Sequence, residues 1–308
     1  MSGTVLPGFL DAHVHLALID PTALAAGGIA RVVDLGGWTP AAARAAGTPA
    51  AGTPTGSPWP LPEVRHAGQF LAAPGGYPGA QPWAPAGSVC EVATAADAAA
   101  AVDKQLAGGA SVIKVTLNSA AGPVLGTDVL TAIVARARQR GTPVVAHAEG
   151  VGQAVRAFAA GVDVLAHTPF SERLVDELVD AMAGRMTWIS TLDIHGWGDE
   201  NDDFARASDN LRRFHACGGR VLYGTDLGNG PLPVGLNRRE IDALLRIGMS
   251  PDEVLGALTA AFPGAASAAN GDRTVSVVPG ERPTDPAGFA EWVCAARALN
   301  RAELEEFV

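Results

Sequence analysis

The chain has 308 residues, of which 48% are hydrophobic and 18% are charged, so it can bury a large core and lacks the composition of a disordered protein. With 22 Lys and Arg against 32 Asp and Glu, its formal net charge of −10 argues against nucleic acid and anionic membranes as partners. The N-terminus shows no signal peptide, and no stretch approaches about 18 consecutive apolar residues, so we expect no membrane span. The 3 cysteines are far apart, which favours the reducing cytoplasm as the location.

A repeated unit runs along most of the chain: a short apolar run, then an amphipathic helix that ends at a glycine. Glycine after the last helical turn adopts the left-handed conformation without a Cβ penalty. The apolar runs lack a polar face, as is typical of parallel strands covered by helices. In chain order we expect strands at 5–15, 29–35, 63–72, 110–117, 143–148, 162–167, 186–192 and 220–225, and helices at 94–107, 127–140, 151–160, 172–183, 204–216, 241–247 and 250–261.

Eight β/α units in about 250 residues predict a (β/α)8 TIM barrel, an α/β fold. A doubly wound sheet is the main rival, but it usually has a glycine-rich phosphate loop after its first strand, and this sequence has none. Two segments rich in Pro and Gly, 39–61 and 73–87, follow expected strands. We therefore expect both at the C-terminal rim of the barrel, where active sites of this fold form.

We expect one barrel domain over residues 1–270 and a short C-terminal extension over 271–308 that packs on it. The extension reads as a short β run at 274–278, a linker rich in Pro and Gly, and a final helix. A segment of this length is too short to form a hydrophobic core by itself.

Six polar side chains interrupt or end the apolar strands, and all of them fall toward the same rim. His13 and His15 are two residues apart, so both imidazoles point to one face of the first strand and can reach one metal ion. The other four are Lys114 on the fourth strand, His147 on the fifth, His167 on the sixth and Asp226 after the eighth.

Each of these residues also has an ordinary structural interpretation. A single histidine at a strand end is more often packed and hydrogen-bonded than a ligand, and Asp226 alone would be read as a turn residue or a helix cap. A strand lysine such as Lys114 usually extends its ammonium group to solvent. The functional interpretation rests on the combination, because independent accidents would rarely place all six at one rim.

These motifs resemble those of the amidohydrolase superfamily of metal-dependent barrel hydrolases. The stretch PGFLDAHVHL matches its first-strand signature, and SVIKV, VVAHAEG, VLAHTPF and YGTD match its ligands on strands 4, 5, 6 and 8. Ala67-Gly68 through Pro74-Gly75-Gly76 is similar to a stretch of the imidazolonepropionase-like and Xaa-Pro dipeptidase-like branch. The resemblance covers about residues 5–270.

The resemblance implies a site with two divalent metal ions, bridged by a carboxylated lysine at position 114. His13, His15, Lys114 and Asp226 would hold one ion, and Lys114, His147 and His167 the other. Burial beside two cations favours the neutral amine of lysine, which can take up CO2 and become an anion with two oxygens. Zn²⁺ suits these ligands best, with Mn²⁺, Fe²⁺ or Co²⁺ as alternatives.

The sequence also departs from the family. Only twelve residues precede His13, where relatives have a long β-rich segment, so the small β domain is expected to be missing or vestigial. Tyr77 stands where the branch often has a histidine. We expect Tyr77 and His195, which both lie on rim loops, to contact the substrate.

The leading functional interpretation is a two-metal hydrolase that uses a metal-activated hydroxide to cleave the C–N bond of an amide or cyclic amide in a small molecule or short peptide. Asp226 would be its catalytic proton carrier. The alternatives are a single-metal deaminase with Glu149 as proton shuttle, a biosynthetic cyclase, and a barrel without catalytic activity. Apolar barrel surface left uncovered by the missing small domain makes a homodimer a further expectation.

Overall fold

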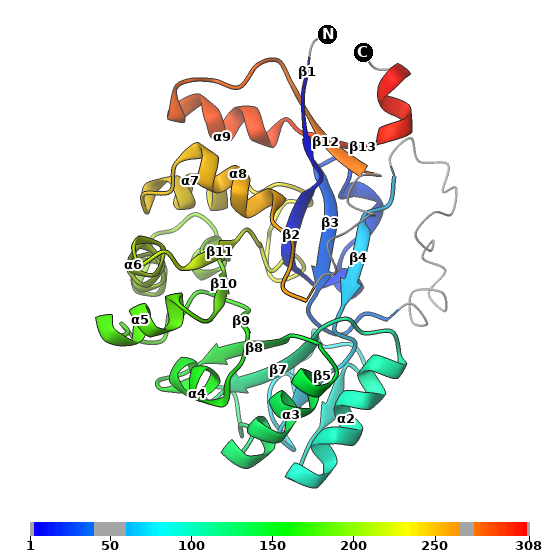
Figure 1. Ribbon diagram of the computed structural model, residues 1–308, viewed down its shortest axis with the longest axis vertical. Coiled ribbons are helices and arrows are strands. Elements are labelled where there is room, and N and C mark those ends of the chain that lie inside the picture. The colour runs from blue at the N-terminus through cyan, green and yellow to red at the C-terminus, as the bar shows by residue number, and fades with distance from the viewer. Residues whose placement is uncertain (1–2, 40–59, 265–273, 307–308) are drawn as a thin grey trace.

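Parallel strands at eight positions form the wall of a (β/α)8 barrel, the fold expected from the sequence (Figure 1). This computed structural model describes residues 3–39, 60–264 and 274–306. Backbone hydrogen bonds join the two sheets of the wall into a ring: the N–H of Asp226 donates to the carbonyl of His13 over 2.8 Å, and that of Ser111 to the carbonyl of His66 over 3.0 Å. The closed ring places the carboxyl ends of all the strands around one opening.

The wall strands follow the order expected from the sequence, and two short strands together occupy the third position. The strands are β2 (Phe9–Val14), β3 (Ile29–Asp34), β4 (Glu63–His66) with β5 (Phe70–Ala72), β7 (Ile113–Asn118), β8 (Val144–Glu149), β9 (Val164–Leu165), β10 (Thr187–Ile189) and β11 (Arg220–Leu222).

Helices surround the wall, and α2 (Ala95–Ala107) begins where the sequence predicts, at a reciprocal cap. The side chains of Thr94 and Asp97 each accept a hydrogen bond from the backbone of the other, which satisfies free N–H groups at the helix start. The helices are α2 (Ala95–Ala107), α3 (Thr127–Gln139), α4 (Gln153–Ala160), α5 (Asp176–Ala183), α6 (Asp202–Ala216), α7 (Arg238–Arg246), α8 (Pro251–Thr259) and α9 (Pro286–Cys294), with short 3-10 turns η1 (Leu16–Leu18), η2 (Pro21–Ala23), η3 (Asp193–His195) and η4 (Arg301–Glu306).

The expected first strand, 5–15, is wrong as a single element. It divides at Gly8 into β1 (Gly3–Pro7) and β2. A Cβ atom at Gly8 would lie 2.7 Å from the carbonyl oxygen of Thr274 and 2.8 Å from the Cβ of Ala30, so a side chain does not fit where the chain crosses between two sheets. The expected strand 63–72 is likewise two strands, β4 and β5, and β6 (Val89–Glu91) was not expected at all.

A small antiparallel sheet is built from both ends of the chain (Figure 1). Strand β1 pairs with β12 (Thr274–Pro279), which pairs with β13 (Arg297–Asn300). The β run and helix α9 agree with the sequence-based expectation, whereas β13, which follows the expected final helix, was not predicted. The division at residues 270 and 271 lies outside the described residues and stays a prediction. Most of the expected rim segment 39–61 is outside them as well.

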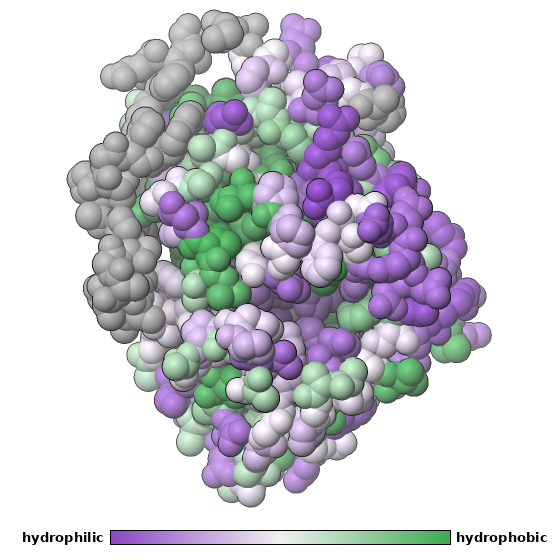
Figure 2. Space-filling view, turned by 180° about the vertical axis from the view of Figure 1, so that it is seen from behind, coloured by the Kyte–Doolittle hydropathy of each residue, from purple (hydrophilic) through white to green (hydrophobic). Residues whose placement is uncertain are grey.

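Figure 2 shows one face, with hydrophilic side chains gathered along one flank and apolar side chains exposed elsewhere. None of the helices in the described ranges is both long and apolar enough to cross a membrane. The expected homodimer stays a prediction.

Candidate metal centre

The six polar side chains singled out in the sequence line one small cavity at the carboxyl ends of the strands. Its volume is about 20 Å³, and a space of about 10–15 Å³ already holds a water molecule. All six side chains are buried. The cavity is lined by His13, His15, Lys114, His147, His167 and Asp226, together with Phe70, Tyr77, Trp83 and Thr116.

His13 and His15 both direct their Nε2 atoms at the carboxylate of Asp226. The distances to Asp226 Oδ1 are 3.0 Å from His13 and 3.1 Å from His15. The opposite ring nitrogens donate to backbone carbonyls, His13 Nδ1 to Ala166 over 2.9 Å and His15 Nδ1 to Gly36 over 3.1 Å. A carbonyl oxygen can only accept, so these bonds place a proton on Nδ1 of each ring.

His13 and Asp226 leave buried atoms facing each other without a hydrogen bond. Burial lowers the pKa of His13 to about 4, so its ring is neutral at pH 7 and its single proton is on Nδ1. Its Nε2 lone pair therefore faces the Asp226 oxygen, and neither atom has a hydrogen-bond partner among the described residues. Two buried acceptors at this distance repel unless a cation lies between them. This arrangement suits a divalent metal ion.

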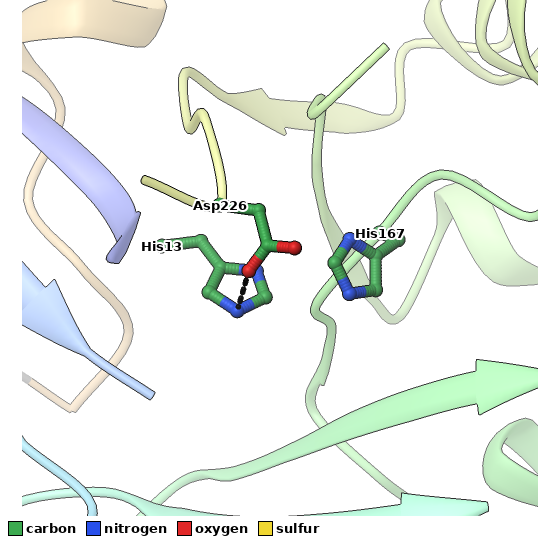
Figure 3. Close-up of side chains that lie close together, drawn as sticks. All are labelled: His13, His167 and Asp226. Atoms are coloured by element: carbon green, nitrogen blue, oxygen red, sulfur yellow. Dashed lines mark ion pairs between the residues drawn. The ribbon is translucent and has the colours of Figure 1, made fainter. Parts of the chain in front are cut away.

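His167 brings a third candidate ligand atom close to those of His13 and Asp226. His13, His167 and Asp226 each offer one ligand atom, and these atoms lie within 4.8 Å of one another. Figure 3 shows the Asp226 carboxylate between the rings of His13 and His167, with a dashed line marking its contact with His13. Neutral imidazoles and an ionised carboxylate are typical zinc ligands.

The backbone around Asp226 is constrained so that its carboxylate reaches the first strand. Asp226 has a φ of +58°, a conformation that Asp tolerates better than most residues. A Cβ at the nearby Gly224 would lie 2.3 Å from Ile189 Cγ2, so only glycine permits this close approach.

Lys114 extends from β7 into the same cavity. Its side chain is only 2% exposed, and burial lowers its pKa to about 7 against the opposing charges of Asp226 and Asp34. Within the described ranges, no carboxylate forms an ion pair with its ammonium group. Part of the lysine population is therefore a neutral amine at pH 7, which is the form that reacts with CO2.

His147 and His167 are held by side chains instead of carbonyls. His147 Nε2 donates to Glu149 Oε2 over 3.0 Å, and that carboxylate also accepts from Asn118 Nδ2 over 2.7 Å. His167 Nδ1 lies 2.9 Å from the hydroxyl of Thr191. The two rings lie 4.9 Å apart between centroids, so both can approach one cation beside Lys114.

The sequence matches the amidohydrolase family over residues 4–263. The chain belongs to this family. Among solved structures it resembles a Xaa-Pro dipeptidase with bound methionine in the active site (TM-score 0.70, 20% identity, 97% of this chain and 86% of that one). It also resembles an A. niger ochratoxinase (TM-score 0.71, 20% identity, 96% of this chain and 82% of that one) and phenylurea hydrolase B (TM-score 0.65, 15% identity, 99% and 87%). At these identities the structures support the barrel fold alone, and a comparison with curated proteins finds no match.

In this amidohydrolase an aromatic wall covers one side of the cavity. The Tyr77 ring stacks on that of His147 with 4.9 Å between centroids, and Trp83 lies 6.0 Å from Tyr77 and 6.2 Å from His15. Tyr77, expected to contact the substrate, therefore lies at the site. A small apolar group of a substrate can pack against this wall.

His195 is placed beside the site and not in it. It ends η3, its ring packs on Phe170 with 4.2 Å between centroids, and it is not among the residues that line the cavity. Burial lowers its pKa to about 4, so the ring is neutral, and its Nε2 has no partner among the described residues. The substrate contact expected for His195 stays a prediction.

Sequence reasoning missed several supporting residues of the amidohydrolase site. Asp11 accepts from the N–H groups of His13 and Thr225 and so joins the first and last wall strands. Asp34 ends an apolar strand, the same signal that singled out the ligands, but it holds the backbone of Leu16 and Gly36. Polarity at a strand end indicates a buried polar network, and only the structure separates the candidate ligands from the residues that support them.

Proposed function

We propose that this amidohydrolase is a two-metal hydrolase that cleaves the C–N bond of an amide or cyclic amide in a small molecule or short peptide. One observation carries the proposal: His13 Nε2 and Asp226 Oδ1 are buried and face each other, and neither has a hydrogen-bond partner among the described residues. Lys114, His147 and His167 line the same cavity. The family and its dipeptidase-like neighbour agree with a hydrolase.

The six residues divide into two ligand sets that share one lysine. His13, His15, Lys114 and Asp226 would hold one cation, and Lys114, His147 and His167 the other. Bound cations would polarise the substrate carbonyl and lower the pKa of a water molecule toward neutrality. Zn²⁺ matches the imidazole and carboxylate donors best, and Mn²⁺, Fe²⁺ and Co²⁺ are the alternatives.

Lys114 would bridge the two sets as a carbamate. The neutral amine attacks CO2, an N–C bond forms and one proton leaves, so that a neutral side chain becomes an anion with two donor oxygens. The depressed pKa of Lys114 favours the amine form that this reaction needs. The anion would also balance the charge of two cations in a buried cavity.

Asp226 would carry the proton of the reaction. Its carboxylate lies at the cavity between His13 and His167, and it would take a proton from the attacking water and deliver it to the leaving nitrogen. Tyr77 and Trp83 would pack against the apolar part of the substrate, and His195 would contact its distal part. Free thiols at Cys90, Cys217 and Cys294 agree with the cytoplasmic location proposed from the sequence.

Three measurements test the proposal. The protein purified with zinc should hold two ions per chain, and ¹³CO2 should give a carbamate carbon signal in NMR that Lys114→Met abolishes. A single-metal deaminase would bind one ion per chain without the carbamate signal. A barrel without catalytic activity would hydrolyse none of a panel of dipeptides, N-acyl amino acids, lactams and hydantoins, and either result would refute the proposal.

A further inference from the structure

Thr191, two residues beyond the end of β10, combines a strained backbone with a contact to a proposed metal ligand. Its φ is +41°, in the left-handed region, where a β-branched residue is a clear outlier. Its side chain is completely buried, and its Oγ1 atom lies 2.9 Å from Nδ1 of His167. Strain of this kind persists only where the surroundings maintain it, and it concentrates at functional sites.

Hydrogen bonds from neighbouring strands hold this backbone in place. The N–H of Thr191 donates to the carbonyl of Gly224 over 3.1 Å, and the N–H of Ser190 donates to the carbonyl of Leu222 over 3.0 Å. Thr168, next to His167, donates its hydroxyl to the carbonyl of Ser190 over 3.0 Å. The strained turn is therefore fixed between the strand ends that carry His167 and Asp226.

Glycine would adopt this backbone conformation without strain. The chain places a threonine there, and the only side-chain hydrogen bond that its hydroxyl makes among the described residues is the one to His167. If Nε2 of His167 binds a cation, Nδ1 must carry the proton and needs an acceptor, which this hydroxyl supplies. The hydrogen bond to His167 therefore explains why a threonine occupies a backbone conformation that favours glycine.

We propose that Thr191 is a positioning residue, whose hydroxyl orients the His167 ring and keeps its Nε2 available for a metal ion. This inference rests on the proposed function in so far as His167 is a ligand. Partners of ligating histidines typically change metal affinity by about 10–100-fold when they are removed.

The test compares three variants at Thr191 with a matched control. Metal-free protein is titrated with Zn²⁺ alone in competition with a chromophoric chelator. Thr191→Val and Thr191→Gly should bind one Zn²⁺ about 10–100-fold more weakly than the wild type, whereas Thr191→Ser, which keeps the hydroxyl, should remain close to it. Thr191→Gly should keep or raise the melting temperature, because it removes the strain, and this separates positioning from stability.

Ser276→Ala is the control, because it removes a buried hydroxyl on β12 that bonds only to backbone groups and lies away from the cavity. It should lower the melting temperature and leave Zn²⁺ affinity unchanged. Wild-type affinity in both Thr191→Val and Thr191→Gly would overturn the proposal for Thr191, while failure of the wild type to bind two ions would overturn the proposed function. If the wild type does not bind two ions, ¹⁵N NMR of the histidine rings still tests the role of Thr191. An unchanged His167 signal in Thr191→Val would then overturn the positioning role.

Discussion

The two ligand groups of the proposed metal centre are supported in different ways. His13 and His15 are held by backbone carbonyls, which accept hydrogen bonds and cannot change their role. His147 and His167 are held by side chains, the carboxylate of Glu149 and the hydroxyl of Thr191. The first group is therefore fixed by the fold itself, whereas support of the second group can be removed by single substitutions.

Loss of the shared lysine should have the largest effect, because it affects both groups. Lys114→Met removes the anion that would join the two cations, so the variant should retain at most one zinc ion and lose activity by about 10⁴-fold, equivalent to several kcal/mol of transition-state stabilisation. Metal analysis and steady-state kinetics measure both effects. Lys104→Met, on the exposed face of α2, is the control and should behave like the wild type. Two zinc ions and normal turnover in Lys114→Met would contradict the bridging role.

Asp226→Asn should have the next largest effect and should act mainly on the first group. The amide keeps the shape of the side chain but loses the charge that faces His13 and His15, and it cannot carry the proton. We expect kcat to fall by about 10³-fold, within the range for a lost acid–base group. Zinc bound by the second group should persist. Unchanged kcat would show that another residue moves the proton.

Glu149→Gln should weaken only the second group, and less severely. The carboxylate accepts from the His147 ring, and its loss should reduce affinity for one of two zinc ions by about 10–100-fold while the other binds normally. Glu253→Gln is a matched control, because Glu253 pairs with His215 over the same 3.0 Å, away from the cavity. Equal weakening of both ions would argue that the two groups do not act separately.

Glu240→Gln should have the smallest effect on activity and a visible effect on stability. Burial raises the pKa of Glu240 from 4.5 to about 7, and its carboxylate accepts from the N–H of Asp193 in the loop after β10. The folded state thus binds this proton more tightly than the unfolded state, so the wild type loses stability as the pH rises from 4.5 to about 7.

Glutamine cannot ionise but keeps an oxygen for the Asp193 N–H. The variant should lack this part of the pH dependence and gain up to about 3 kcal/mol relative to the wild type above pH 7. Urea unfolding at pH 5 and pH 8 measures the difference. Identical pH dependence in both proteins would show that Glu240 does not ionise in this range.

The sequence by itself determined the barrel and the six residues at its mouth. Helix starts such as Thr94 with Asp97 are local features, and apolar runs that end in His147 or His167 reveal both the strand and its polar end. In a parallel barrel the carboxyl ends of all strands meet at one rim, so the order of the residues along the chain was sufficient to group them.

Only the tertiary structure decided which contacts cross between distant segments. The break at Gly8 depends on Thr274, and β13 exists because β12 offers it an edge, so neither is visible in local sequence. Asp34 and the proposed ligands give the same sequence signal, and their roles separate only by what surrounds each carboxylate. The strained Thr191 has no sequence signature, because backbone strain arises from hydrogen bonds to neighbouring strands that the fold alone brings together.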